Sequence, residues 1–318
     1  MEKFTMNDTT IAFIGLGLIG GSLAKGIKKA RPDIRIMAYM RTRSKLEQAK
    51  KDGIVDVILD GIDEQLKQCD LIFLCTPVEY NAQYLSKIRS YLKPGALITD
   101  VGSTKTDIHK EILRQGLTDC FVGGHPMAGS EKTGYENATD HLLENAYYIV
   151  TPPEGFNQNG CGYGNISPKY SENVKRIIAV AQTVGAIPLV LDYKEHDTVV
   201  AAISHLPHLV ASSLVNLVKD SDSPAETMKQ VAAGGFKDIT RIASSSPEMW
   251  EQICMTNSEP IADMLERYID SLQDILSEIK GHQGNAIYKL FEKSRDSCFD
   301  HTSYYYTFFS VSPQALLR

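Results

Sequence analysis

The chain has 318 residues, of which 43% are hydrophobic and 23% charged, as in ordinary globular proteins. Its net charge of −6 and pI near 5.8 argue against nucleic acid or an anionic membrane surface as the main partner. No apolar run is expected to reach the roughly 18 residues of a membrane span, and the N-terminal MEKFTMNDTT is too short and polar for a signal peptide. We therefore expect a cytoplasmic enzyme or binding protein of about two domains.

The first part of the chain alternates β-rich runs with helical segments. Strands are expected at 9–15, 34–40, 55–59, 69–77, 95–103, 120–126, 146–152 and 188–192. Helices are expected from the first glycine turn to about residue 30, over 44–53 and over 171–184, and the segment 155–170 is interpreted as an exposed excursion. Near-continuous apolar strands between helices predict a parallel sheet covered on both faces. Residues 1–192 are thus interpreted as a doubly wound α/β domain.

The remainder, 193–318, shows helical periodicity without further strands. One apolar stripe runs along 197–217 and consists of Val199, Ile203, Leu206, Val210, Leu214 and Leu217. Pro207 lies inside this helix and is expected to kink it. A second amphipathic helix is expected over 264–280, and the aromatic C-terminal segment 304–318 is expected to pack against something. The six cysteines have neither a CxxC pair nor metal-ligand spacing, so no metal site is predicted.

A glycine-rich loop lies between the first strand and the first helix. It reads Gly15-Leu-Gly17-Leu18-Ile19-Gly20. In this setting the first glycine permits a tight turn, the second lets the backbone approach a pyrophosphate, and the third lets helix and strand pack closely. A glycine-rich turn without a ligand is the alternative, but the context favours a dinucleotide site.

The end of the second strand bears on the choice of dinucleotide. NAD-binding domains usually carry an acidic residue about 20 positions after the glycines, where it binds the ribose hydroxyls. Here that place holds Met40, followed by Arg41 and Arg43. Guanidinium groups bind a 2′-phosphate well, so NADP is predicted as the preferred cofactor, with NAD possible. Arginines of a solvated loop are the alternative interpretation.

Polar residues also follow later strands of the predicted sheet. His125 opens the sequence HPMAGSE directly after one strand, and Ser103 lies in DVGSTK after the preceding strand. Ligands of such sheets bind at the carboxyl ends of the strands, so a histidine in this place is a candidate for catalysis. A structural histidine is the alternative.

The long helix carries a polar face opposite its apolar stripe. Asp197, Ser204, His208 and Ser212 fall within about 80° of one another on a regular helix, with His205 close by. Downstream, Arg241 lies just before a helix that begins with Ser246 as N-cap and Pro247 at the first position. Trp250, the only tryptophan, is expected mainly to pack. A solvated surface face is the alternative for this helix.

These motifs together resemble the prephenate/arogenate dehydrogenase family of tyrosine biosynthesis. The resemblance rests on GLGLIGGS, DVGSTK, HPMAGSEKTG, EHDTVVAAISHLPH and GGFKDITRIASSSPEMW, and extends from residue 11 to about 255. It implies a Rossmann domain over 1–192 and an all-helical substrate-binding and dimerisation domain over 193–318, as in 6-phosphogluconate dehydrogenase-like proteins. It also implies a homodimer, and the chain length leaves no expectation of a C-terminal ACT domain.

The resemblance further implies roles for individual residues. His125 corresponds to the catalytic histidine and Ser103 to its hydroxyl-orienting partner, while His208 and Arg241 correspond to the binders of substrate carboxylates. The remaining candidates are Ser204 and His205 for substrate, Thr76 and Pro77 with the glycine loop and Arg41 for cofactor, and Glu131, Asp197, Lys237 and Trp250 for a polar network at the cleft mouth.

The implied reaction is the NAD(P)-dependent oxidative decarboxylation of prephenate to 4-hydroxyphenylpyruvate. Three alternatives stay open at this point. An arogenate dehydrogenase would act on the amine analogue and give tyrosine directly, and another hydroxy-acid oxidoreductase would need a catalytic lysine, Lys219 or Lys229. A regulator that senses NADP(H) without chemistry would have no need of the histidine, serine and arginine motifs.

Overall fold

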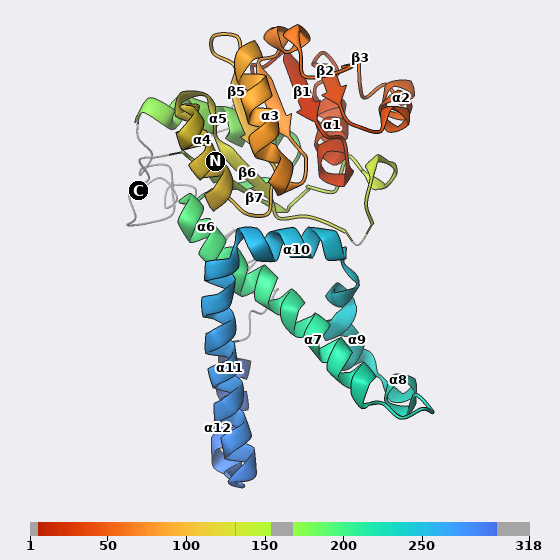
Figure 1. The fold of residues 1–318 in the computed structure, drawn as a ribbon, viewed down its shortest axis with the longest axis vertical. Helices are drawn as coiled ribbons and strands as arrows, with labels where there is room; N and C mark the ends of the chain where they lie inside the picture. The colour runs from red at the N-terminus through yellow and green to blue at the C-terminus, as the bar shows by residue number, and fades with distance from the viewer. Residues whose placement is uncertain (1–5, 131, 154–167, 298–318) are drawn as a thin grey trace.

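The computed structural model describes residues 6–130, 132–153 and 168–297. An α/β domain at the N-terminus is followed by a helical domain that extends from it as two arms (Figure 1). Most of the predicted excursion 155–170 and the aromatic segment 304–318 lie outside the described residues.

The first sheet is parallel throughout and has the strand order β3-β2-β1-β4-β5. Its strands are β1 (Thr10–Ile14), β2 (Arg35–Tyr39), β3 (Val57–Ile58), β4 (Leu71–Leu74) and β5 (Leu97–Asp100). The helices of this domain are α1 (Leu18–Ala30), α2 (Arg43–Lys51), α3 (Asn81–Ile88), α4 (Thr106–Gln115) and α5 (Pro168–Thr183). Because the strand order reverses beside β1, the crevice at the carboxyl ends of β1 and β4 is the expected ligand position.

A second sheet continues this domain and departs from the predicted parallel arrangement. Its strands are β6 (Gly123–Pro126), β7 (Tyr147–Thr151) and β8 (Ile187–Val190). β6 pairs with β7 antiparallel, whereas β7 and β8 are parallel. A parallel crossover usually needs a helix, but the described residues between β6 and β7 form only the 3₁₀ turn η5 (Tyr135–Asn137). The sheets meet at a parallel bridge between Ile98 and Phe121.

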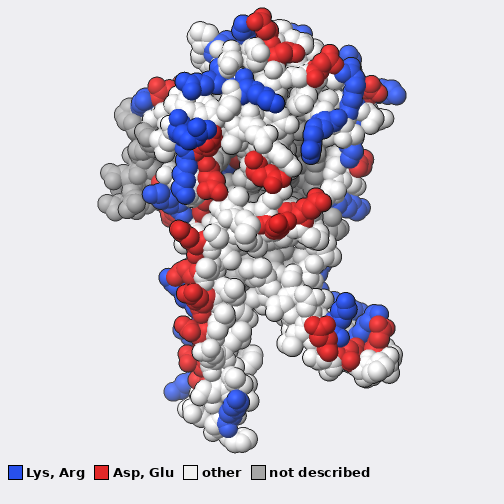
Figure 2. All heavy atoms as spheres, in the orientation of Figure 1, with Lys and Arg blue, Asp and Glu red and all other residues white. Residues whose placement is uncertain are grey.

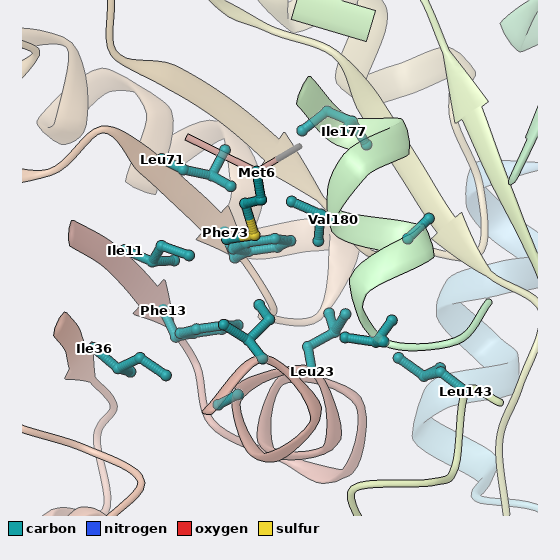
Figure 3. Close-up of a cluster of buried hydrophobic side chains, with 14 of the residues drawn as sticks. Met6, Ile11, Phe13, Leu23, Ile36, Leu71, Phe73, Leu143, Ile177 and Val180 are labelled. Atoms are coloured by element: carbon teal, nitrogen blue, oxygen red, sulfur yellow. The ribbon is translucent and has the colours of Figure 1, made fainter. Parts of the chain in front are cut away.

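Apolar side chains on both faces of the first sheet form two cores. The rings of Phe13 and Phe73, on neighbouring strands, stack with centroids 4.8 Å apart. Leu23 of α1 and Val180 of α5 cover this face, as Figure 3 shows. The other face packs against α3 and α4 through Leu85 and Ile112, among others. Burial on both faces explains why these strands are apolar at nearly every position.

The helical domain begins with a single long stretch that contains a π-helical turn. This stretch comprises α6 (Tyr193–Val200), the π turn η7 (Ala201–His205) and α7 (Leu206–Ser221). Pro207 lies in the first turn of α7, where its missing N–H costs least, so the predicted distortion is a π turn placed just before it. The remaining elements are α8 (Thr227–Val231), α9 (Gly234–Thr240), the 3₁₀ turn η8 (Arg241–Ser244), α10 (Pro247–Thr256), α11 (Ser258–Lys280) and α12 (Gly284–Ser297).

The long stretch contradicts the expectation that no apolar run in the chain reaches the length of a membrane span. Residues Tyr193–Ser221 are long and apolar enough to cross a membrane by length and composition alone, with a mean hydropathy of 1.5 in an 18-residue window. His196, Asp197 and His205 within it are nevertheless buried and hydrogen-bonded inside the protein. These contacts indicate that the stretch is a central structural helix of the helical domain.

The two arms expose much apolar surface in a single chain. Ile203 and Leu217 of the predicted stripe are each 63% exposed. Further exposed apolar side chains belong to α11 and α12 and include Ile269, Leu272, Leu276, Ile279 and Phe291. Figure 2 shows that the inner sides of both arms carry few charges, whereas charged side chains line the outer edge of the α11–α12 arm. Such a surface is typical of a protein–protein interface.

Candidate active site

The glycine loop joins β1 to α1 at the carboxyl edge of the first sheet. Gly15 has a φ of +93°, and a Cβ atom there would lie 2.6 Å from the carbonyl oxygen of Cys75, so only glycine fits. Gly17 is the N-cap of α1, and apart from Gly17 and its neighbours along the chain, no described residue comes within 4 Å of the Cβ position there. The first N–H groups of α1 therefore open onto space that a pyrophosphate can occupy.

The other predicted cofactor residues lie around this loop. Leu18 and Ile19 form the first turn of α1, and Gly20 packs so closely that an added Cβ would lie 2.8 Å from the carbonyl oxygen of Gly15. Thr76 and Pro77 follow β4, and the Thr76 hydroxyl donates to Asn81 Oδ1 at 2.9 Å. These residues fit a dinucleotide at the place where β1 and β4 end.

A pocket of about 410 Å³ lies beyond the end of β2 and includes Arg41 and Lys87 in its lining. The guanidinium of Arg41 lies 5.3 Å from the ring centre of Tyr80, which also lines the pocket. Arg43 is placed differently, because it pairs with Asp60 and lies 3.5 Å from Glu47. Of the two arginines expected to bind a 2′-phosphate, Arg41 lines this pocket, whereas Arg43 is engaged in ion pairs.

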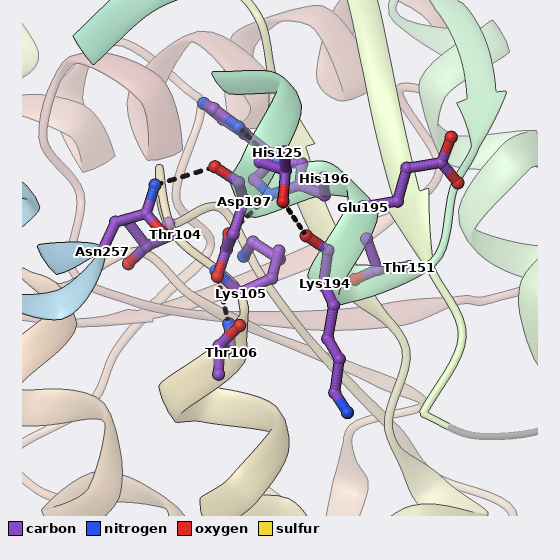
Figure 4. Close-up of polar contacts among 12 residues, drawn as sticks. Thr104, Lys105, Thr106, His125, Thr151, Lys194, Glu195, His196, Asp197 and Asn257 are labelled. Carbon is purple, nitrogen blue, oxygen red and sulfur yellow. Dashed lines mark hydrogen bonds and ion pairs between the residues drawn. The ribbon is translucent and has the colours of Figure 1, made fainter. Parts of the chain in front are cut away.

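His125, at the end of β6, lies in a buried chain of hydrogen bonds. Its Nδ1 is 2.8 Å from Nε2 of His196, and Nδ1 of His196 is 2.8 Å from Oδ1 of Asp197 (Figure 4). Burial lowers the pKa of His125 well below its usual range, and the neighbouring His196, Lys105 and His205 act in the same direction. His125 is therefore neutral at physiological pH, as a general base must be.

Asp197 joins the helical domain to the α/β domain. Its Oδ1 accepts from the backbone N–H of Lys105 at 2.8 Å and its Oδ2 from that of Thr106 at 2.7 Å. Burial acts to raise the pKa of Asp197, but the hydrogen bonds from His196 and Thr106 outweigh it and hold the pKa below the usual value. Asp197 therefore lies beneath His125 and not at the cleft mouth, contrary to the sequence-based expectation.

Lys105 and Asp100 form a fully buried ion pair under the same site. Both side chains are 0% exposed, and Asp100 also accepts from the backbone N–H groups of Gly102 and Gly124. Nearby, His109 of α4 bonds to the hydroxyl of Thr151 at 2.9 Å, and burial lowers its pKa to about 3. The contacts of Asp100 fix the DVGSTK loop, which carries Ser103 between the two charged residues.

Ser103 is half-buried in this loop. Its hydroxyl forms no hydrogen bond to the residues that the structure describes, so it is available to a ligand. The next residue, Thr104, bonds through its hydroxyl to that of Thr256 in α10 at 3.0 Å. The Ser103 loop is thereby held against the helical domain.

His205 faces the same cluster from the π turn. Asn257 Nδ2 donates to the carbonyl oxygen of Asp197 at 2.8 Å and lies 3.1 Å from Nδ1 of His205. Burial lowers the pKa of His205 to about 4, so it is neutral, and its Nδ1 must accept from the Asn257 amide. The hydrogen of His205 therefore lies on Nε2.

His208 and Trp250 extend the histidine cluster beyond His205. Their rings stack with centroids 4.0 Å apart, and the Trp250 ring also meets that of His205 edge-on at 5.9 Å. His208 Nδ1 lies 2.8 Å from the carbonyl oxygen of Ser204, so that nitrogen carries a hydrogen. Nε1 of Trp250 is buried without a hydrogen-bond partner among the described residues, and a ligand can satisfy it.

Arg241 is near enough to His208 to lower its pKa, although burial is the larger cause of that shift. It is exposed at the start of η8, which packs against α7. Lys237 lies one turn earlier on α9 and is also exposed. Ser246 caps α10 through the N–H of Met249, as predicted, and α10 packs against the turn η2 (Val78–Tyr80) that follows Pro77. The helix of Trp250 thus faces the predicted cofactor site.

Some candidates are placed elsewhere or cannot be placed. Glu131 lies outside the described residues. Lys229 pairs with Glu226 on α8, far along one arm, and Lys219 is exposed near the end of α7, so neither meets the histidine cluster. Among the described residues, no group of three or more His, Cys, Asp or Glu side chains is placed to hold a metal ion.

His196 and Asn257 are the residues that sequence reasoning missed. His196 precedes Asp197 in the EHD motif, directly after the turn capped by Asp192. Because α6 reads YKEHDTVV and is polar at most positions, no local signal distinguishes the buried His196 and Asp197 from their exposed polar neighbours. Asn257 joins α10 to α11 and has no local signal either.

Two family models match the chain. Residues 23–160 match the model described as the nucleotide-binding domain of prephenate dehydrogenase, and residues 192–293 match the model of its dimerization domain. The chain is 36% identical to prephenate dehydrogenase of Bacillus subtilis over 291 residues, which is 90% of this chain and 74% of that protein. It is 28% identical to cyclohexadienyl dehydrogenase of Zymomonas mobilis, over 90% of this chain and 93% of that protein.

Solved structures agree with these matches. Prephenate dehydrogenase of Aquifex aeolicus, solved with hydroxyphenyl propionate and NAD⁺, is similar with a TM-score of 0.80 and 30% identity, over 91% of this chain and 96% of that chain. Synechocystis arogenate dehydrogenase is similar with a TM-score of 0.75 and 28% identity, over 91% and 98% of the two chains. The likeness covers both domains of the fold.

Proposed function

Since the chain belongs to the prephenate dehydrogenase family, we propose that it oxidises and decarboxylates prephenate to 4-hydroxyphenylpyruvate. The observation that carries the proposal is the position of His125. This neutral, buried histidine lies near the end of strand β6 of the α/β domain and close to His205. The rings of Trp250 and His208 continue the cluster from His205 toward Arg241. A base and a cation at opposite parts of one cluster suit a substrate with a hydroxyl at one end and a carboxylate at the other.

His125 and Ser103 act on the ring hydroxyl of the substrate. His125 takes the proton of the ring hydroxyl, and Ser103 orients that hydroxyl. The O–H electron pair then forms the carbonyl, and a bound nicotinamide supplies the acceptor for the hydride that leaves the same carbon. Loss of CO₂ returns an electron pair to the ring, which becomes aromatic, and the phenol oxygen takes a proton back from His125. The histidine therefore ends the cycle neutral.

Arg241 and His208 bind the carboxylate end of the substrate. Arg241 is a permanent cation near His208, and the Nδ1–H of His208 is occupied by the Ser204 carbonyl. Burial and Arg241 lower the pKa of His208, so in its neutral form Nε2 has only a lone pair, and His208 can donate to a carboxylate only after it takes up a proton on Nε2, which a bound carboxylate favours. His205, with its hydrogen on Nε2, is a neutral donor in the same cluster.

The test of this proposal is an assay with prephenate and either cofactor, following the absorbance of the reduced nicotinamide. Wild type should reduce the cofactor, and His125→Asn should lower kcat by roughly two to four orders of magnitude while substrate and cofactor still bind. Arogenate is assayed in parallel, because a relative of similar fold is an arogenate dehydrogenase. A larger kcat/KM with arogenate would replace the proposed substrate, and no reduction with either compound would favour a cofactor-sensing protein.

NADP is the proposed preferred cofactor. Arg41 and Lys87 line the pocket beyond β2, where Met40 replaces the acidic residue that would repel a 2′-phosphate. One partly solvated arginine–phosphate contact should favour NADP over NAD by about 1–2 kcal/mol, or roughly 5- to 30-fold. Arg41→Ala should remove this preference, measured as the ratio of kcat/KM for the two cofactors.

Arg43→Ala is the matched control for this experiment. Arg43 lies two residues away but already pairs with Asp60 and Glu47, so its loss should change the ratio less than twofold. A wild type that prefers NAD tenfold or more would show the proposed preference to be wrong.

We also expect a homodimer. The second family model describes a dimerization domain, and only 22% of the most apolar window of Tyr193–Ser221 is buried within one chain. A second copy would cover the apolar inner sides of the arms that Figure 2 shows.

A further inference from the structure

We propose that His196 and Asp197 form a relay that fixes the tautomer of His125, leaving its Nε2 without a hydrogen and ready to take the substrate proton. In this relay His196 is a positioning residue that acts through His125. The inference deepens the proposed function and rests on it for the role of His125 as base.

The relay starts from a carboxylate that can only accept hydrogen bonds. Both oxygens of Asp197 already receive backbone N–H groups, from Lys105 at 2.8 Å and Thr106 at 2.7 Å. These donors, at the N-terminus of α4, stabilise the ionised form of the carboxyl. The His196 nitrogen that lies 2.8 Å from Oδ1 must therefore donate, so the hydrogen of His196 is on Nδ1.

The state of His125 follows from that of His196. Burial lowers the pKa of both histidines, so each ring carries one hydrogen at neutral pH. Because the hydrogen of His196 is on Nδ1, its Nε2 accepts, and the donor 2.8 Å away is Nδ1–H of His125. The remaining nitrogen of His125, Nε2, then has only a lone pair. That is the form that a general base requires.

The same arrangement stabilises the product of proton transfer. When the substrate O–H bond breaks and an Nε2–H bond forms, His125 becomes a buried cation. Its Nδ1–H already donates to His196, which donates to the ionised Asp197, so the charge forms at the end of an aligned row of dipoles. No atom of the relay has to move for this stabilisation to act.

The first test determines the tautomer directly by ¹⁵N NMR of the imidazole rings in the full-length wild type. The chain has only eight histidines, and His125→Asn identifies the signals of His125 by their loss. We expect a protonated Nδ1 and an unprotonated Nε2 at neutral pH, and a change toward protonated Nε2 in His196→Leu. A hydrogen on Nε2 of His125 in wild type would overturn the proposal.

The second test uses kinetics. His196→Leu removes the acceptor, and kcat should fall roughly 10²- to 10⁴-fold, the range for a misoriented or wrongly protonated base, with both KM values within about threefold of wild type. His196→Gln places an amide oxygen near the former Nε2 and should recover at least about tenfold of this loss. Equal losses in both variants, or a kcat of His196→Leu within about threefold of wild type, would refute the relay.

His109→Gln is the matched control. His109 is also a buried histidine, but it bonds to Thr151 and is not part of the relay. Its kcat should stay within about threefold of wild type. A loss of kcat as large as that of His196→Leu would mean that replacing any buried histidine here lowers kcat by disturbing the fold, and not by breaking the relay. If wild type oxidises neither prephenate nor arogenate, the proposed function fails, while the NMR result still decides whether the relay exists.

Discussion

The buried pair of Lys105 and Asp100 allows a prediction about stability. Replacing Lys105 by Met keeps most of the side-chain volume but leaves the Asp100 carboxylate without its cation, although Gly102 and Gly124 still donate to it at 2.9 and 3.2 Å. Breaking a fully buried pair in this way typically costs about 3–5 kcal/mol. For a domain of this size that corresponds to a fall in Tm of roughly 6–20 °C. Differential scanning calorimetry measures the fall, and denaturant unfolding gives the free energy.

Two further variants separate this effect from a general loss of charge. Lys105→Met combined with Asp100→Asn removes the uncompensated charge, so it should be more stable than Lys105→Met alone. Lys67→Met breaks an exposed pair with Glu64, 3.2 Å apart, and should change the free energy of unfolding by less than about 0.5 kcal/mol. A loss below about 1 kcal/mol for Lys105→Met would refute the reasoning that the pair is fully desolvated.

Three other outcomes are expected. Arg241→Ala should raise KM for the substrate about 10- to 150-fold with a smaller effect on kcat, because a charge-assisted bond contributes roughly 1.5–3 kcal/mol; a collapse of kcat at constant KM would assign it a catalytic role. Light scattering at micromolar concentration should give about twice the chain mass of 35.2 kDa, and a mass near one chain would contradict the dimer. Since the pKa of His109 falls to about 3 on folding, the unfolded chain takes up a proton near and below pH 6.5 that the folded chain does not. Lowering the pH from 6.5 to 5 should therefore cost wild type about 1–2 kcal/mol more than His109→Gln, and equal losses would show that His109 is not buried as described.

The sequence predicts the first sheet well because its signals are local. Apolar runs such as 71–74, which is buried at every position, and the glycine loop from Gly15 to Gly20 specify strand, turn and helix within a few residues of one another. The antiparallel pairing of β6 with β7 was not predicted, since it depends on a connection without a helix and not on the strands themselves. The π turn before Pro207 likewise replaces the simple kink that the sequence predicts.

The candidate site shows the same division between local and distant signals. The motifs that contain His125, His208 and Arg241 could be chosen from sequence, because residue type and position in a motif are local properties. That His196 meets His125 across 71 residues, or that Arg43 is neutralised by Asp60, depends on how the chain folds back on itself. The family resemblance predicts a role for Asp197 at the cleft mouth, but its burial beneath His125 follows from a contact with the start of α4.

That contact has a consequence for how the enzyme can move. Asp197 belongs to α6 and holds the first turn of α4, so any motion that separates the two domains here also draws His196 away from His125. The junction between the domains therefore cannot act as a hinge during turnover without separating His196 from His125, the proposed base. Amide exchange at Lys105 and Thr106, whose N–H groups donate to Asp197, should therefore stay slow during turnover.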